Sequence, residues 1–310
     1  KNPENEPESG GYCSLAYTLA MAKKIKESGM HFLLDFHYSD YWADPSSQKK
    51  PEQWKNLSFE ELEQAVFDYT KDTLMVFKKE GVLPDMVQIG NEVRSGLLFP
   101  DGELPDYIHI VRLLNAGIRG ARLAAGMDEM QVIIHLDQGG RYFYLKEWFS
   151  KAIENGLENF YVIGLSYYPF WHGTFSDLKE TMEHLVQDYH KPIMIVETAY
   201  AWRSSQNGFI DEVQEKIAGF NASPENQAKA LKLVMNIVAS LPEQMGRGVY
   251  YWEPLCLPFP GEGGWAENMG LLDEDGGVME GINVFRFTRK EACGEEYVKV
   301  YTPSPVIVQP

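Results

Sequence analysis

The feature that most constrains this 310-residue chain is a strict alternation between short apolar segments and longer segments with helical spacing of apolar residues. Six short segments have strand character, at 31–36, 86–89, 131–137, 160–169, 191–200 and 248–254. Segments with helical spacing precede or separate them, at 12–28, 58–81, 105–125, 142–154, 175–189 and 223–241. Apolar strands that alternate with helices are typical of parallel strands covered on their faces. We therefore expect one α/β domain.

Two parallel architectures compete, and the strand ends distinguish them. A doubly wound sheet places a glycine-rich phosphate turn after its first strand, and neither GxGxxG nor GxxxxGK[ST] follows any predicted strand. A barrel gathers functional groups at the carboxyl ends of many strands. Polar or aromatic residues end all six segments here: Asp35 and His37, Asn91 and Glu92, His135 and Asp137, Ser166 to Tyr168, Glu197, and Trp252 with Glu253.

This pattern predicts a (β/α)8 TIM barrel. A closed barrel of this type has eight strands, so we expect its first two strands to be missing from this sequence. We expect the N-terminally incomplete catalytic barrel domain to span residues 1–290. Residues 291–310 are expected to form a C-terminal tail that packs on the barrel or extends from it.

Composition excludes several classes of function. The formal net charge of −17 argues against nucleic acid and anionic membrane surfaces, which need basic side chains. No apolar run is long enough for a transmembrane helix. Cys13, Cys256 and Cys293 show no metal-like spacing. Buried free thiols are the expectation, with one disulfide as the alternative.

Glu92 and Glu197 are the candidate catalytic residues. With two strands upstream they would end barrel strands four and seven, which face each other across the barrel mouth. Two carboxyl groups in that arrangement suit the cleavage of a glycosidic bond, where one protonates the leaving oxygen and the other attacks the sugar carbon or activates water. Tyr167 and Tyr168 are predicted to donate hydrogen bonds to Glu197. Asn91 is predicted to hold a sugar hydroxyl.

Other strand-end and loop side chains are candidate substrate-binding groups. Flat aromatic rings that stack on sugars are predicted at Trp42, Trp171, Trp252 and Trp265, and hydrogen-bonding groups at His37, Asp40, His135 and Asp137. Each has a structural alternative, such as a buried core histidine, a turn-capping aspartate or a tryptophan that only packs a loop. Paired histidines of the HxH type are absent from the sequence, so a metal-dependent hydrolase is not favoured.

The motifs LLDFHYSDYWADP, QIGNE, SYYPFWHG and IVETAY in combination resemble glycoside hydrolase family 53, the endo-β-1,4-galactanases, over residues 2–287. The resemblance implies an endo-acting, retaining enzyme that cleaves β-1,4-galactan, the side chain of type I arabinogalactan in pectin. It also implies that Glu92 is the acid/base and Glu197 the nucleophile. No cofactor is expected. A structural calcium ion, with Ser204, Ser205, Asn207 and Asp211 as candidate ligands in the loop 199–221, is an alternative that the sequence does not favour.

Two further readings stay open. Another member of the same clan, such as a β-mannanase or an endoglucanase, would keep the carboxylate pair and change only the walls of the cleft. A non-catalytic glycan-binding barrel is the alternative of a different class. We expect a monomer whose partner is the polysaccharide. Because that polymer is too large to import intact, we expect a secreted, cell-surface or periplasmic protein.

Overall fold

The computed structural model describes residues 13–126, 130–158, 160–204, 210–257 and 264–286. The predicted tail at 291–310 and Cys293 lie outside these residues. Cys13 and Cys256 are free thiols as expected, but the expectation that they are buried is wrong, because Cys13 is exposed and Cys256 is partly exposed. The chain forms two compact units, Lys1–Asp137 with Glu147–Ile163 and Gln138–Lys146 with Gly164–Pro310. None of the helices in the described ranges is both long and apolar enough to cross a bilayer.

Six strands form one sheet in the order β1-β2-β5-β6-β7-β8. A strand occurs in or overlaps each of the six predicted segments: β1 (Leu33–Phe36), β2 (Met86–Ile89), β5 (Gln131–Leu136), β6 (Val162–Ser166), β7 (Ile193–Glu197) and β8 (Gly246–Val249). The printed pairs β1/β2, β2/β5 and β7/β8 are parallel. Parallel strands that follow one another in sequence and pair in space need a crossover connection, which is usually a helix, and the helical segments supply these connections.

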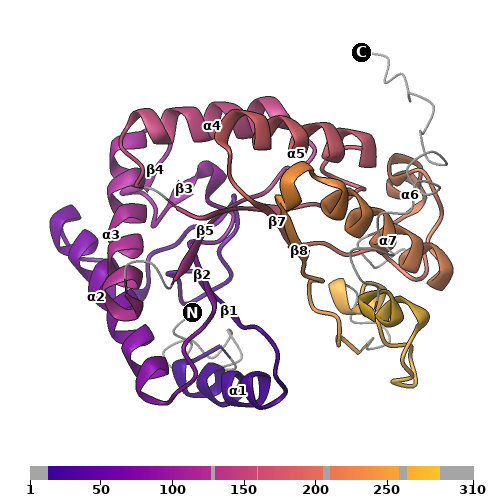
Figure 1. Ribbon diagram of the computed structural model, residues 1–310, viewed down its shortest axis with the longest axis horizontal. Coiled ribbons are helices and arrows are strands. Elements are labelled where there is room, and N and C mark those ends of the chain that lie inside the picture. The colour runs from indigo at the N-terminus through magenta and orange to yellow at the C-terminus, as the bar shows by residue number, and fades with distance from the viewer. Residues whose placement is uncertain (1–12, 127–129, 159, 205–209, 258–263, 287–310) are drawn as a thin grey trace. The chain divides into compact units, whose positions relative to one another are not determined.

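The first unit contains the strands β1, β2 and β5 with the helices α1 (Leu15–Glu27), α2 (Phe59–Lys79) and α3 (Tyr107–Ala125). The helix α2 begins at the predicted capping box, in which Ser58 and Glu61 satisfy each other's backbone amides. Helices α2 and α3 lie side by side (Figure 1). Their close approach requires Gly120, because a Cβ atom there would lie 2.5 Å from the Phe67 carbonyl oxygen.

A short antiparallel hairpin, β3 (Gly96–Leu97) with β4 (Gly102–Glu103), follows β2 and was not predicted. The 3-10 helices η3 (Glu52–Trp54) and η4 (Val93–Ser95) also belong to this unit. Elements of two or three residues carry too few side chains to show a periodic pattern, which is why the sequence does not reveal them.

The second unit holds β7 and β8 with the helices α5 (Phe175–Tyr189), α6 (Glu212–Ala218) and α7 (Pro224–Ser240), and the 3-10 helices η5 (Pro242–Gln244), η6 (Trp265–Glu267) and η7 (Glu280–Arg286). The helix α4 (Tyr142–Glu154) contributes to both units. The predicted N-cap at Ser223 is confirmed, since its side chain accepts from the Asn226 amide. The short helix α6 was not predicted.

The predicted last strand, 248–254, is wrong at its end. The strand β8 spans Gly246–Val249, and its register with β7 shifts between Ile193 and Ile195. Beyond Val249, Tyr250 N donates to the Ile195 carbonyl oxygen of β7 at 2.8 Å, and Trp252 N donates to the carbonyl oxygen of Thr198, just after β7, at 2.9 Å. Trp252 and Glu253 therefore follow the strand on an irregular extension.

Candidate active site

Strained backbone marks the carboxyl ends of several strands. Four residues that are not glycine have positive φ just beyond the end of a strand. They are Tyr38 after β1, Glu92 after β2, Gln138 after β5 and Glu253 after β8. Such conformations cost about 1–3 kcal/mol and persist only where surrounding contacts enforce them, most often at functional sites. The backbone thus points to the same strand ends that the sequence singles out.

In the first unit, Glu92 lies directly beyond β2 in the left-handed region, with φ 46° and ψ 52°. The buried side chain of Gln48 holds this turn by donating from Nε2 to the carbonyl oxygens of Asn91 (2.8 Å) and Glu92 (3.5 Å). The Glu92 side chain itself is partly exposed. Gln48 therefore fixes the backbone from which the candidate acid projects.

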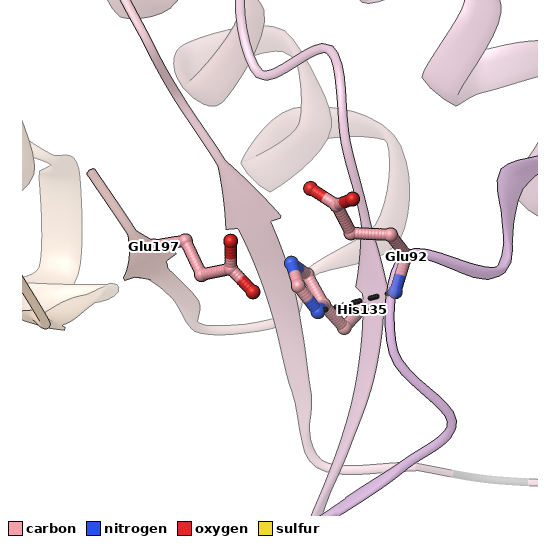
Figure 2. A group of neighbouring side chains, drawn as sticks. All are labelled: Glu92, His135 and Glu197. Carbon is pink, nitrogen blue, oxygen red and sulfur yellow. Dashed lines mark hydrogen bonds between the residues drawn. The ribbon is translucent and has the colours of Figure 1, made fainter. Parts of the chain in front are cut away.

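His135 is fully buried at the end of β5. The Glu92 amide donates to His135 Nδ1 at 3.3 Å (Figure 2). A carboxylate oxygen of Glu92 also lies within 4.8 Å of a ring nitrogen of His135. Gln88 and Asn91 contact the same Nδ1 atom from β2 and its end. His135 therefore contacts the Glu92 backbone and lies close to its carboxylate.

Both ends of the Asn91 side-chain amide form hydrogen bonds within the protein. Its Nδ2 donates to the Ala43 carbonyl oxygen at 2.8 Å, and its Oδ1 accepts from Gln88 Nε2 at 3.2 Å. The predicted role of Asn91 in holding a sugar hydroxyl stays a prediction. What the structure adds is that Asn91 fixes the orientation of neighbouring polar groups.

Asp137 is buried after β5 and forms an ion pair with Arg94, whose Nε lies 2.7 Å from Oδ1. Sequence reasoning named Asp137 and missed Arg94. The signal that could have found it is its position two residues after Glu92, on the same strand-end turn. Because buried charged groups are normally paired, this ion pair gives Asp137 a structural role, since it ties the end of β5 to the turn that carries Glu92.

His37 and Asp40 also have protein partners. His37 is buried, its Nδ1 accepts from the Ala43 amide at 3.1 Å, and its Nε2 lies 3.0 Å from Asp35 Oδ2. Asp40 is buried and accepts from the Glu52 amide at 2.8 Å. These contacts favour a role in shaping the loops after β1. Trp42 is half exposed, with its ring edge-on to His37, and its role as a sugar platform stays a prediction.

In the second unit, Glu197 ends β7 and its side chain projects from the strand end (Figure 2). Only 8% of the residue is exposed. The Tyr168 hydroxyl donates to Glu197 Oε2 at 3.0 Å, as predicted. The prediction that Tyr167 also donates to Glu197 is wrong, because the Tyr167 hydroxyl donates to the Gly173 carbonyl oxygen at 3.0 Å. Adjacent residues of an extended chain point to opposite sides, so only one of the two can reach Glu197.

Aromatic rings surround Tyr168 in this unit. Trp171 and Trp265 lie edge-on to it, with ring centroids at 5.7 and 5.5 Å. Trp171 is 40% exposed, and Trp265 and Trp252 are partly exposed. Of the tryptophans predicted as sugar platforms, the structure therefore brings Trp171 and Trp265 together beside the hydrogen-bond donor of Glu197.

The proposed calcium ligands have other partners where they are described. The Asp211 carboxylate caps α6 by accepting from the Val213 and Gln214 amides, and Ser204 hydrogen-bonds Glu215. Ser205 and Asn207 lie outside the described residues. A hard cation needs several oxygen ligands close together, and the structural calcium ion stays an untested alternative.

The fold and the side chains at its strand ends define the class of α/β barrel glycoside hydrolases. Comparison with known proteins gives the particular family. The family model of glycosyl hydrolase family 53 matches residues 1–285, and the chain belongs to this family.

Relatives and solved structures agree with that assignment. A protein of Niallia circulans, described as an uncharacterized protein in the bgaB 5′ region, is 42% identical over 266 residues, covering 82% of this chain and 72% of the relative. The arabinogalactan endo-beta-1,4-galactanase of Cellvibrio japonicus is 36% identical, covering 84% and 72%. The catalytic domain of an Ignisphaera aggregans protein of this family superposes with a TM-score of 0.83 at 37% identity, covering 90% and 79%. The predicted family and (β/α)8 barrel fold are confirmed.

Proposed function

We propose that this protein is an endo-acting, retaining galactanase that cleaves β-1,4-galactan of the type found in pectin arabinogalactan. The observation that carries the proposal is that the family match spans both Glu92 and Glu197. Each of these residues stands at the carboxyl end of a strand in the same sheet. The name of the Cellvibrio japonicus relative supports the substrate.

In the proposed mechanism, Glu92 donates its proton to the glycosidic oxygen while the Glu197 carboxylate attacks the anomeric carbon. The bond between carbon and leaving oxygen breaks, and a covalent glycosyl–enzyme ester forms. Glu92, now ionised, then takes a proton from a water molecule that attacks the same carbon and releases Glu197. Two inversions give net retention of configuration.

The chain's own contacts suit these roles. A nucleophile must be ionised, and the Tyr168 hydroxyl at 3.0 Å favours the charged form of Glu197. Burial of both side chains keeps water from weakening that hydrogen bond. Gln48 fixes the turn that carries Glu92, so the acid does not have to be oriented at the moment of reaction.

The exposed aromatic rings suit a sugar polymer. Trp42, Trp171 and Trp265 offer flat apolar faces that can stack on the apolar faces of sugar rings. Stacking contacts of this kind suit an endo-acting enzyme, which binds the middle of a sugar chain. We propose that the protein meets this polymer outside the cell or at its surface, which fractionation of the producing cells would test.

The test is hydrolysis of galactan, β-mannan and cellulose by the parent and by Glu92→Ala and Glu197→Ala. Activity on galactan alone is expected, with release of oligosaccharides in the β configuration when followed by proton NMR. On an aryl β-galactoside whose leaving group needs no protonation, added azide should restore turnover in both variants and give glycosyl azides of opposite anomeric configuration, because azide replaces the nucleophile in Glu197→Ala and attacks the glycosyl–enzyme intermediate in Glu92→Ala. Binding of galactan without turnover in the parent would instead support the glycan-binding alternative, and turnover of mannan or cellulose the clan alternatives.

A further inference from the structure

A chain of amide contacts fixes the orientation of polar groups behind Glu92. It starts at a backbone carbonyl oxygen, that of Ala43, which can only accept. Asn91 Nδ2 donates to it at 2.8 Å, so Asn91 Oδ1 must face the other way. That oxygen lies 3.2 Å from the Gln88 side chain, which must therefore present its nitrogen and not its oxygen. The Gln88 amide is oriented by its neighbours.

The same Gln88 nitrogen lies 2.9 Å from His135 Nδ1. An amide nitrogen carries two hydrogens, so one can bond Asn91 Oδ1 while the other bonds His135. The Glu92 backbone amide, which also can only donate, points at the same Nδ1 atom at 3.3 Å. Asn91 Oδ1 also lies 3.0 Å from Nδ1, and a proton on Nδ1 would serve this one acceptor. That oxygen already accepts from Gln88 Nε2, whereas the proton would oppose both donors that meet Nδ1, so the contacts favour an unprotonated Nδ1.

We propose that Gln88 is a positioning residue that holds His135 as the neutral tautomer with its proton on Nε2. His135 then acts at the end of β5 as a hydrogen-bond donor and not as a base. Gln88, Asn91 and His135 are all at least 97% buried, so water cannot readily take the place of the glutamine. Sequence reasoning placed Gln88 only as an interior residue of a strand.

The tautomer matters for the neighbouring acid. A Glu92 carboxylate oxygen lies within 4.8 Å of a ring nitrogen, and a positive imidazolium at that distance would favour the ionised form of a carboxyl. A neutral ring avoids this effect and leaves Glu92 able to carry a proton. This consequence for catalysis rests on the proposed glycosidase function, whereas the tautomer itself does not.

The decisive measurement is nitrogen-15 NMR of the histidine rings in the parent and in Gln88→Met. The His135 signals are assigned by their loss in His135→Gln. In the parent we expect Nδ1 to resonate far downfield, as an unprotonated nitrogen, and Nε2 as a protonated one. In Gln88→Met, which keeps the length of the side chain but loses its donor, a mixture of tautomers is expected together with an about tenfold lower kcat on galactan.

Gln227→Met is the matched control, because Gln227 is also fully buried and donates to three oxygens, including those of Tyr200 and Gly270. It should lose stability and leave the His135 signals unchanged. A protonated Nδ1 in the parent would overturn the proposal, as would an unchanged tautomer in Gln88→Met. If Gln88→Met does not fold, the parent spectrum still decides. An inactive parent with the expected signals would refute the proposed function and leave the Gln88 assignment standing.

Discussion

Replacing Tyr168 by phenylalanine removes one oxygen atom from the surroundings of the candidate nucleophile. That hydroxyl donates to Glu197 Oε2 at 3.0 Å, and only 5% of Tyr168 and 8% of Glu197 is exposed. Hydrogen bonds to charged groups contribute about 1.5–3 kcal/mol, and each 1.36 kcal/mol is a factor of ten. We therefore expect kcat on galactan to fall between about 10- and 150-fold, with a small change in KM.

The pH dependence gives a second readout of the same change. Because the hydroxyl favours the ionised carboxylate, its loss lets Glu197 take up a proton at higher pH. The acidic limb of the kcat/KM profile should therefore move to higher pH in Tyr168→Phe, while the basic limb stays in place. Steady-state kinetics across the pH range measure both effects in one series.

Tyr167→Phe is the matched control, since it removes the same oxygen from the next residue. The Tyr167 hydroxyl bonds the Gly173 carbonyl oxygen, so its loss should cost about 1 kcal/mol of stability and leave kcat within a fewfold of the parent. The reasoning is refuted if Tyr168→Phe keeps full activity and the parental pH profile, or if both variants lose activity equally.

Three further changes test other parts of the structure. Gln48→Met removes the donor that holds the left-handed turn at Glu92 and should lower kcat about tenfold; a folded variant with parental kcat would contradict this. The pKa of Asp85 is lowered from 3.8 to about 2, because the bond from Lys26 and other donors outweigh the opposing effect of burial, so its stabilisation is complete above pH 3.8 and is lost as the pH falls toward 2. In urea unfolding, Asp85→Asn should therefore lose about 1 kcal/mol near neutral pH, allowing for solvent screening, and nothing at the acid end; a constant difference would refute the link. Gly120→Ala places a Cβ atom 2.5 Å from a carbonyl oxygen of α2 and should cost about 1–3 kcal/mol in thermal unfolding, whereas an unchanged Tm would show that the two helices separate easily.

Much of the fold follows from local patterns. The alternation of apolar strands with capped helices predicts the parallel sheet, and the capping residues Ser58 and Ser223 begin their helices as expected. These elements can be predicted from the sequence because helix caps and periodic apolar faces involve residues only a few positions apart. The polar strand ends and the family motifs likewise place Glu92 and Glu197 without any coordinates.

The partners of those residues were decided only by the tertiary structure. Whether Tyr167 or Tyr168 reaches Glu197 depends on strand register, and a shift of one residue would exchange them. Gln48, Gln88 and Arg94 hold groups whose positions are set by loops and strands up to 47 residues away in sequence. No local pattern records such pairings, because they arise only when packing fixes both ends and excludes the water that would otherwise satisfy each polar group.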